Sequence, residues 1–175
     1  MVCPRCIMAV ENIMQKLAVP FKDVKMGEVV LHEEISRDIM PLFESELHKI
    51  GFEVITDPKA QLLEQVRILV REYVDDENEK KVNLSLHLSE KLGYDYTYLS
   101  NLFSAETGAT IEKYYIAQRI EKAKELLRHR DSSVSHVAAR LGYSSSAYLS
   151  AQFKKITGIT PGEYKTLFVA NRANL

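Results

Sequence analysis

Residues 98–114 read YLSNLFSAETGATIEKY, and residues 148–164 read YLSAQFKKITGITPGEY. The two windows share eight identities in 17 positions, namely Tyr98/Tyr148, Leu99/Leu149, Ser100/Ser150, Phe103/Phe153, Thr107/Thr157, Gly108/Gly158, Thr110/Thr160 and Tyr114/Tyr164. A Leu-Gly-Tyr triplet precedes both windows, at 92–94 and at 141–143. Repeats of this length usually reflect one supersecondary unit used twice. The chain therefore carries the same small unit in two copies.

Each copy predicts two short helices joined by a turn that contains glycine. In the first copy, Leu88 and Leu92 share one helical face, and Gly93 is placed to end that helix in a left-handed turn. Asp95 is then placed to cap a second helix by accepting hydrogen bonds from its free backbone N–H groups. The inward face of this second helix carries Leu99, Leu102 and Phe103. Two helices in this order describe a helix-turn-helix.

The second copy repeats the arrangement around Gly142, with Ser144 or Ser145 placed to cap its second helix. Between the copies, apolar residues at helical spacing predict one linker helix from about residue 110 to about residue 128. At about 1.5 Å per residue this helix spans about 27 Å. Adjacent major-groove faces of B-DNA lie about 34 Å apart, so one chain could place both second helices in neighbouring grooves.

These stretches resemble the DNA-binding domain of the AraC/XylS-type bacterial transcription regulators. The resemblance covers about residues 82–166, and the second copy is its more diagnostic part, with Tyr148, Phe153-Lys154-Lys155, Gly158 and an ending from Thr160-Pro161 to Tyr164. It implies an all-α domain over residues 80–166, with two helix-turn-helix units on one linker helix. It also implies a sequence-specific transcription regulator whose partners are double-stranded promoter or operator DNA and the transcription machinery.

The resemblance further implies that bases are read by the outward face of each second helix. These faces comprise Tyr96, Thr97, Ser100 and Asn101 in the first copy, and Ser145, Ser146, Ala147, Ser150 and Ala151 in the second. Asn101 is the strongest single candidate, because an amide can form two hydrogen bonds with adenine. The second face offers only Ser and Ala, without Arg or Gln. We therefore expect the second copy to contribute mainly backbone positioning and shape reading.

The charge distribution supports a nucleic-acid partner although the net charge is only −1. Residues 80–175 contain 14 Lys and Arg against 8 Asp and Glu, whereas residues 57–79 contain 3 against 7 and residues 1–56 contain 6 against 9. Binding to phosphate requires local positive charge. The candidate phosphate contacts are Lys154 and Lys155 on the second helix and Lys113, Lys124 and Arg128 on the linker helix. A solvated helix face is the alternative for each of them.

The first 56 residues predict a different fold. A helical pattern from Ile7 to Leu17 precedes a hairpin at 21–31, a helix at about 36–50 and a strand at 52–56. This order is what remains of a ferredoxin-like βαββαβ unit once its first strand is shortened. We therefore expect an α+β module over residues 1–56, ahead of the all-α domain.

Cys3 and Cys6 are the only cysteines, and they lie where a helix N-terminus would lower the pKa of a thiol. Together with Gly51-Phe52-Glu53-Val54 they resemble the small heavy-metal-associated domains, which hold Cu(I) or a related ion between two thiolates. Three interpretations stay open: a sensor of a soft metal ion such as Cu(I) or of thiol state, a redox disulfide, and a vestigial pair in a protein-interaction module. Zinc would need further ligands, from a partner chain or from a histidine such as His32 or His48. DNA binding itself requires no cofactor.

Residues 57–79 predict a connecting helix that ends in the acidic run DDENE. This helix either packs on the first helix-turn-helix as part of the DNA-binding domain or forms a dimer seam, although two heptads are short for an independent coiled coil. Residues 167–175 are expected to form a C-terminal tail. The oligomeric state stays open.

The composition sets the broad class. With 175 residues and 46% hydrophobic content, the chain can bury one or two modest cores. No stretch approaches transmembrane length and no leader precedes the first module, so we expect a cytoplasmic location without a membrane partner. No nucleophile-and-base spacing indicates an enzyme. The competing function is a metal-handling or redox CxxC protein whose C-terminal domain tethers it to DNA.

Overall fold

The computed structural model describes residues 4–76, 83–129 and 131–173. The chain divides into two units, Met1–Ile68 and Leu69–Leu175. The division falls within helix α3 (Pro58–Asp75), which the sequence predicted as a connecting helix. Each unit has a core of its own.

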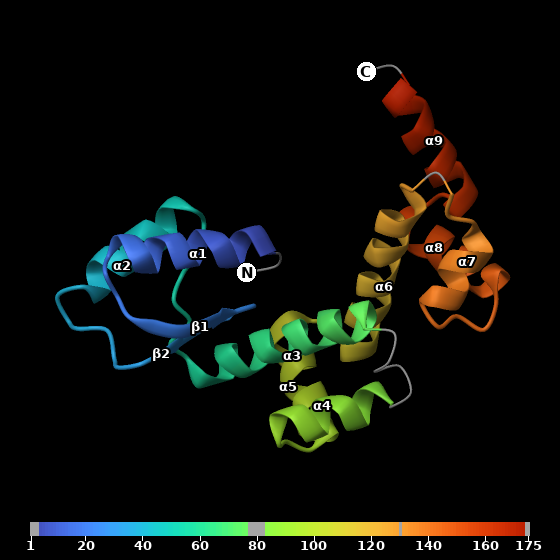
Figure 1. The fold of residues 1–175 in the computed structure, drawn as a ribbon. Coiled ribbons are helices and arrows are strands. Elements are labelled where there is room, and N and C mark those ends of the chain that lie inside the picture. The colour runs from blue at the N-terminus through green and yellow to red at the C-terminus, as the bar shows by residue number, and fades with distance from the viewer. Residues whose placement is uncertain (1–3, 77–82, 130, 174–175) are drawn as a thin grey trace. The chain divides into compact units, whose positions relative to one another are not determined.

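The N-terminal unit contains two helices, a hairpin and the first part of α3 (Figure 1). The elements ahead of α3 are α1 (Pro4–Lys16), β1 (Phe21–Lys25), β2 (Glu28–Leu31) and α2 (Met40–Lys49). The strands pair antiparallel, and Gly27 turns the chain between them with a φ of +79°. Helix α1 packs against both β1 and α2, and the shared core consists of Val10, Ile13, Met14, Val19, Val24, Phe43 and Leu47. The predicted hairpin and the helices on either side of it are confirmed.

The ferredoxin-like fold predicted for residues 1–56 is not confirmed, and the strand predicted at 52–56 was wrong. In the part of the chain that the structure describes, the sheet contains β1 and β2 alone, and residues 52–56 form neither strand nor helix. Phe52 and Val54 still pack against the core as partly buried side chains. Side-chain burial alone thus accounts for the alternating pattern that predicted a strand.

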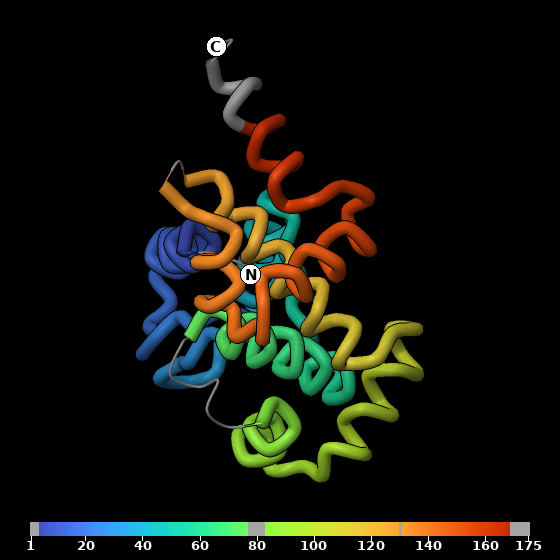
Figure 2. The backbone as a smooth tube through the Cα atoms, turned by 90° about the vertical axis from the view of Figure 1, so that its right-hand side faces the viewer, coloured from blue at the N-terminus to red at the C-terminus, as the bar shows by residue number. Residues whose placement is uncertain are grey.

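Over its described residues, the C-terminal unit contains helices and no strand (Figures 1 and 2). After α3 it contains α4 (Leu84–Leu92), α5 (Tyr96–Thr107), α6 (Ile111–Leu127), α7 (Val134–Arg140), α8 (Ser146–Thr157) and α9 (Pro161–Ala173). Helices α4 and α5 form the first helix-turn-helix, α7 and α8 form the second, and α6 contacts helices of both. The predicted linker helix is confirmed. The residues expected as a tail from 167 onward instead continue α9 to Ala173.

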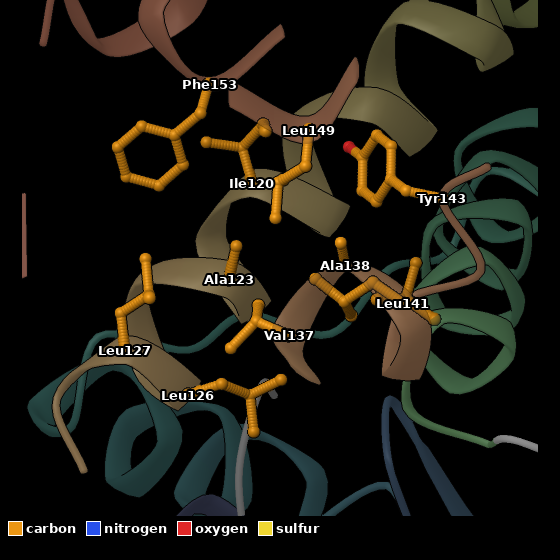
Figure 3. Packing of buried hydrophobic residues seen from close by; sticks show 11 residues of the cluster. Ile120, Ala123, Leu126, Leu127, Val137, Ala138, Leu141, Tyr143, Leu149 and Phe153 are labelled. Carbon is orange, nitrogen blue, oxygen red and sulfur yellow. The ribbon is translucent and has the colours of Figure 1, made fainter. Parts of the chain in front are cut away.

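The core of the second helix-turn-helix is built on α6 (Figure 3). Ile120, Ala123 and Leu127 lie at helical spacing on α6, and each is 0% exposed. They pack against Val137, Ala138 and Leu141 near α7 and against Leu149 and Phe153 of α8. Val74 of α3 belongs to the same cluster, and the Tyr73 ring of α3 lies 5.3 Å, between centroids, from the His87 ring of α4. Helix α3 therefore contacts the first helix-turn-helix, as the first of its two interpretations predicted, and it contacts the second as well.

Most of the identities between the two copies have matching structural roles. The Thr107 Oγ1 atom lies 2.6 Å from the Phe103 carbonyl oxygen, and Thr157 Oγ1 lies 2.8 Å from that of Phe153. The following residue in each copy is a glycine in the left-handed region. The rings of Tyr114 and Tyr164 then pack 5.6 Å, between centroids, from those two phenylalanines. The repeat therefore preserves the way each second helix ends and how the next helix packs on it.

The end of α8 gives a first prediction. Gly158 has a φ of +82°, and a Cβ atom there would meet nothing within 4 Å, so the cost of Gly158→Ala is the left-handed backbone alone. We expect it to lower the free energy of unfolding by about 1–2 kcal/mol. Gly162→Ala is the matched control, because Gly162 has no positive φ and equally free surroundings, and it should leave stability unchanged or slightly higher. Equal losses for both variants in denaturant unfolding would contradict this interpretation.

Candidate nucleic-acid interface

Both second helices begin with a side-chain cap. The Asp95 Oδ1 atom accepts a hydrogen bond from the Thr97 backbone N–H at 2.8 Å, and the Ser145 Oγ atom accepts one from that of Tyr148 at 3.1 Å. Hydrogen bonds from the Thr97 side chain and backbone lower the pKa of the Asp95 carboxyl. Both predicted caps are confirmed, and of the two serines proposed for α8 it is Ser145 that acts. The caps define where each outward face starts.

Two of the four residues predicted on the outward face of α5 are exposed. Thr97 and Asn101 are exposed and lie one helical turn apart, whereas Ser100 is half-buried. Tyr96 is also half-buried, and its hydroxyl donates a hydrogen bond to the Glu112 carboxylate of α6. Burial and this contact raise the pKa of Tyr96 far above its ordinary value. Tyr96 thus ties α5 to α6, which leaves Thr97 and Asn101 as the accessible polar pair.

The outward face of α8 consists of small side chains with little free hydrogen-bonding capacity. Ala147 and Ala151 are exposed, and Ser146 is half-buried. Ser150 donates its hydroxyl hydrogen bond to the Ser146 carbonyl at 2.8 Å, and the Ser145 hydroxyl oxygen serves as the cap. The face is therefore smooth and allows close approach of the helix backbone to a partner.

The candidate phosphate contacts fall into two groups. Lys154 and Lys155 are exposed at the end of α8 and form no ion pair with any residue that the structure describes, and Lys113 is exposed near the start of α6. Lys124 pairs with Glu121 at 2.6 Å. The Arg128 guanidinium lies 5.1 Å from the centre of the Phe168 ring. The first three lysines are therefore better placed than the latter two.

The structure also identifies polar residues that the sequence interpretation left out. Tyr98 and Tyr148 are 47% and 52% exposed on the first turns of α5 and α8. Gln152 of α8 hydrogen-bonds to Tyr143 at 2.8 Å, which joins the turn before α8 to the helix itself. The identity of Tyr98 and Tyr148 in the repeat was a signal for the first two. Gln152 has no counterpart in the first copy, where Leu102 stands in its place.

The N-terminal unit shows no metal centre among the residues that are described. Cys6 is half-buried in α1, and Cys3 lies outside the described residues. Within the described ranges, no group of three or more His, Cys, Asp and Glu side chains is arranged to hold a metal ion. The structure therefore leaves the predicted role of Cys3 and Cys6 untested.

We also searched the described helices for a membrane span. None of them combines the length and the apolar character that crossing a bilayer requires.

The cap of α8 gives a second prediction. Ser145→Ala removes the acceptor of the Tyr148 N–H and should lower the free energy of unfolding by about 1 kcal/mol. Ser145→Asp restores an acceptor and should recover most of the loss. Ser144→Ala, one residue earlier at an exposed position that caps no helix, is the control. A loss for Ser144→Ala as large as that for Ser145→Ala would refute the assignment of the cap.

Comparison with known proteins agrees with this architecture. A family model described as a helix-turn-helix domain matches residues 88–166. The transcriptional regulatory protein YesN of Bacillus subtilis is 31% identical over 162 residues, which cover 89% of this chain and 40% of YesN. The chain spans between a tenth and two fifths of the length of such curated relatives.

Solved structures show the same relationship. The C-terminal domain of the two-component response regulator yesN from Fusobacterium nucleatum is 32% identical, with a TM-score of 0.50, and the match covers 58% of this chain and 95% of that domain. The DNA-binding domain of AdpA, solved in complex with a target DNA, is 25% identical with a TM-score of 0.54, over 63% of this chain and 96% of that one. The names of these relatives describe them as transcriptional regulators. Through its C-terminal unit, this chain belongs to the AraC-type helix-turn-helix family of transcription regulators.

Proposed function

We propose that this chain is a cytoplasmic, sequence-specific regulator of transcription that inserts α5 and α8 into adjacent major grooves of one double-stranded DNA. The observation that carries the proposal is that one helix, α6, contacts both helix-turn-helix units while each second helix keeps an exposed outer face. With 17 residues, α6 spans about 26 Å, which suits two successive groove faces. The target DNA of AdpA, a relative in fold and sequence, supports the choice of partner.

Base reading falls mainly to the first unit. Asn101 is exposed, and its amide can bond the N6 and N7 atoms of adenine together. Thr97 lies one turn earlier and can offer a hydroxyl or a methyl group to a base. Tyr96 does not take part in this reading, since its hydroxyl is held by Glu112.

The second unit has a different role in this proposal. Its small face brings the backbone of α8 close to the bases, where Ala147 and Ala151 can contact thymine methyl groups. Lys154 and Lys155 then lie exposed at the end of the same helix, where they can neutralise phosphates. We infer that α8 contributes contacts to the phosphate backbone and recognition of DNA shape, while α5 supplies most of the discrimination between bases.

Modulation by a soft metal ion or by thiol state at Cys3 and Cys6 remains part of the proposal. It rests on the spacing of the two thiols in the sequence and not on the fold, because the ferredoxin-like module is not confirmed. The competing function, a metal-handling or redox protein tethered to DNA, gives no reason for a small polar outer face on α5 and α8. A regulator that is modulated at the two thiols should change its affinity for DNA when metal or oxidant is added. A tethered metal-handling protein should not.

Substitutions on the two faces should have different effects. Asn101→Ala should relax the choice of base at one position, at a cost of about 1–3 kcal/mol for the preferred sequence and little for others. Lys154→Ala should weaken binding to all sequences alike and reduce the slope of log affinity against log salt by about 1. Lys22→Ala, at an exposed lysine of the hairpin, is the control for charge removal elsewhere. A uniform loss for Asn101→Ala, measured over a panel of single-base variants, would contradict its role in base reading.

Selection of bound DNA from a random pool tests the function as a whole. One extended site covering two major grooves supports use of both units by a single chain, whereas inverted half-sites indicate a dimer. Repeating the selection with Cu(I), Zn(II) or an oxidant tests the cysteines. Cu(I) binding without any change in DNA affinity would favour the tethered metal-handling protein, and failure to enrich any sequence would count against a regulator.

A further inference from the structure

An exposed tyrosine on the first turn of α8 is held by a chain of contacts that begins on α6. Tyr148 is 52% exposed, and its ring packs edge-on against that of Tyr143, with centroids 5.8 Å apart. Exposing so much aromatic surface gains nothing in water, and a ring packed in this way has lost much of its rotational freedom before any partner arrives. The Tyr148 ring is therefore held in place before a partner binds, at the edge of the outer face of α8 between the cap Ser145 and Ala151.

The contacts behind Tyr148 run through three side chains. The Arg119 guanidinium of α6 lies 3.6 Å from the centre of the Tyr143 ring and donates a hydrogen bond to the Leu141 carbonyl at 2.8 Å. Tyr143 is only 7% exposed and lies beside Leu141 and Leu149 (Figure 3). Its hydroxyl donates to Gln152 Oε1 at 2.8 Å, and Gln152 Nε2 donates to the Tyr148 hydroxyl oxygen over a longer 3.4 Å.

The direction of these hydrogen bonds determines what Tyr148 can do. Because the Gln152 amide uses its oxygen toward Tyr143, its N–H groups face the Tyr148 oxygen. The Tyr148 oxygen then accepts, and its own hydrogen stays available to an acceptor outside the protein. Burial raises the pKa of Tyr143, so that residue remains a donor and keeps the amide in this orientation.

We propose that Tyr148 donates a hydrogen bond from its hydroxyl to a DNA phosphate, and that Tyr143 and Gln152 are positioning residues for this contact. The proposal rests on the proposed function, since it assigns one more DNA contact to α8. Neutral tyrosine hydroxyls are ordinary donors to phosphate oxygens, and a bond to a charged acceptor is stronger than one between neutral groups. The contact lies at the first turn of α8, whereas Lys154 and Lys155 lie in the last turn of the same helix.

The first helix-turn-helix lacks this series of contacts, so it provides an internal comparison. Tyr98 is 47% exposed and stacks on Tyr94, which is itself 47% exposed, at 5.5 Å between centroids. Leu102 stands where the second copy has Gln152, so no amide orients the Tyr98 hydroxyl. We therefore expect the hydroxyl of Tyr148 to contribute more to DNA binding than that of Tyr98.

Removal of the Tyr148 hydroxyl alone tests the contact in the full-length chain. On the DNA enriched by selection, Tyr148→Phe should bind about fivefold to thirtyfold more weakly. The loss should be the same for all sequences, and the slope of log affinity against log salt should not change, because a neutral donor releases no counterion. Lys154→Ala, which should reduce that slope, is the matched comparison. Tyr148→Phe binding within twofold of the wild type would overturn the proposal.

A second variant tests the positioning role. Tyr143→Phe combined with Gln152→Leu removes both hydrogen-bonding partners and leaves no buried hydroxyl unsatisfied. In the wild-type background, this double variant should weaken DNA binding. In the Tyr148→Phe background, the same two substitutions should cause no additional loss of affinity. The melting temperature of each variant shows whether it still folds. Additive losses, or a loss for Tyr98→Phe as large as for Tyr148→Phe, would overturn the positioning role. If the wild type enriched no DNA, the proposed function itself would fail, whereas silent Phe variants with a binding wild type would remove this inference alone.

Discussion

Burial of the apolar residues of α6 is the interaction on which the C-terminal unit depends. The first residue of this helix, Ile111, is fully buried, as are Ile120, Ala123 and Leu127 farther along it. The helix therefore cannot leave either helix-turn-helix without exposing apolar surface, at about 25 cal/mol for each Å². Hydrogen bonds add to this attachment, from Tyr96 of α5 to Glu112 and from Arg119 to the turn before α8. The separation of the two second helices is set by the length of one rigid element.

On this shared frame the two copies have diverged. The positions that are identical in both copies mostly end the second helix or pack the helix that follows, as Thr107 and Thr157 do through matching contacts to the carbonyls of Phe103 and Phe153. The outward positions differ, with Thr97 and Asn101 in one copy against Ala147 and Ala151 in the other. The two copies are thus alike at packing positions and differ on the faces that would meet DNA.

The sequence predicted the parts of the fold that local chemistry determines. Asp95 could be identified as a cap, Ser144 and Ser145 as the two candidates for the other cap, and Gly93 as a left-handed helix end, because these conformations need particular residue types at particular offsets. The linker helix followed from apolar periodicity alone. These features all depend on residues within a few positions of one another.

What the sequence could not reveal depends on contacts between distant residues. Tyr96 has the spacing of an outward residue, yet Glu112, 16 positions later, binds its hydroxyl. Arg119 and Tyr143 similarly meet across 24 positions. The prediction of a strand at 52–56 was wrong for a related reason, because an irregular segment can also pack alternating apolar residues against a core without pairing with another strand.

The central claim is that one chain uses both second helices on a single DNA. Hydroxyl-radical footprinting of the wild type on its selected site tests this most directly. The account predicts two protected stretches on one face of the duplex, centred about one helical turn, or roughly 10 base pairs, apart. A single protected stretch at concentrations that saturate the site, with the same pattern for a variant in which the face of α8 is disrupted, would contradict it.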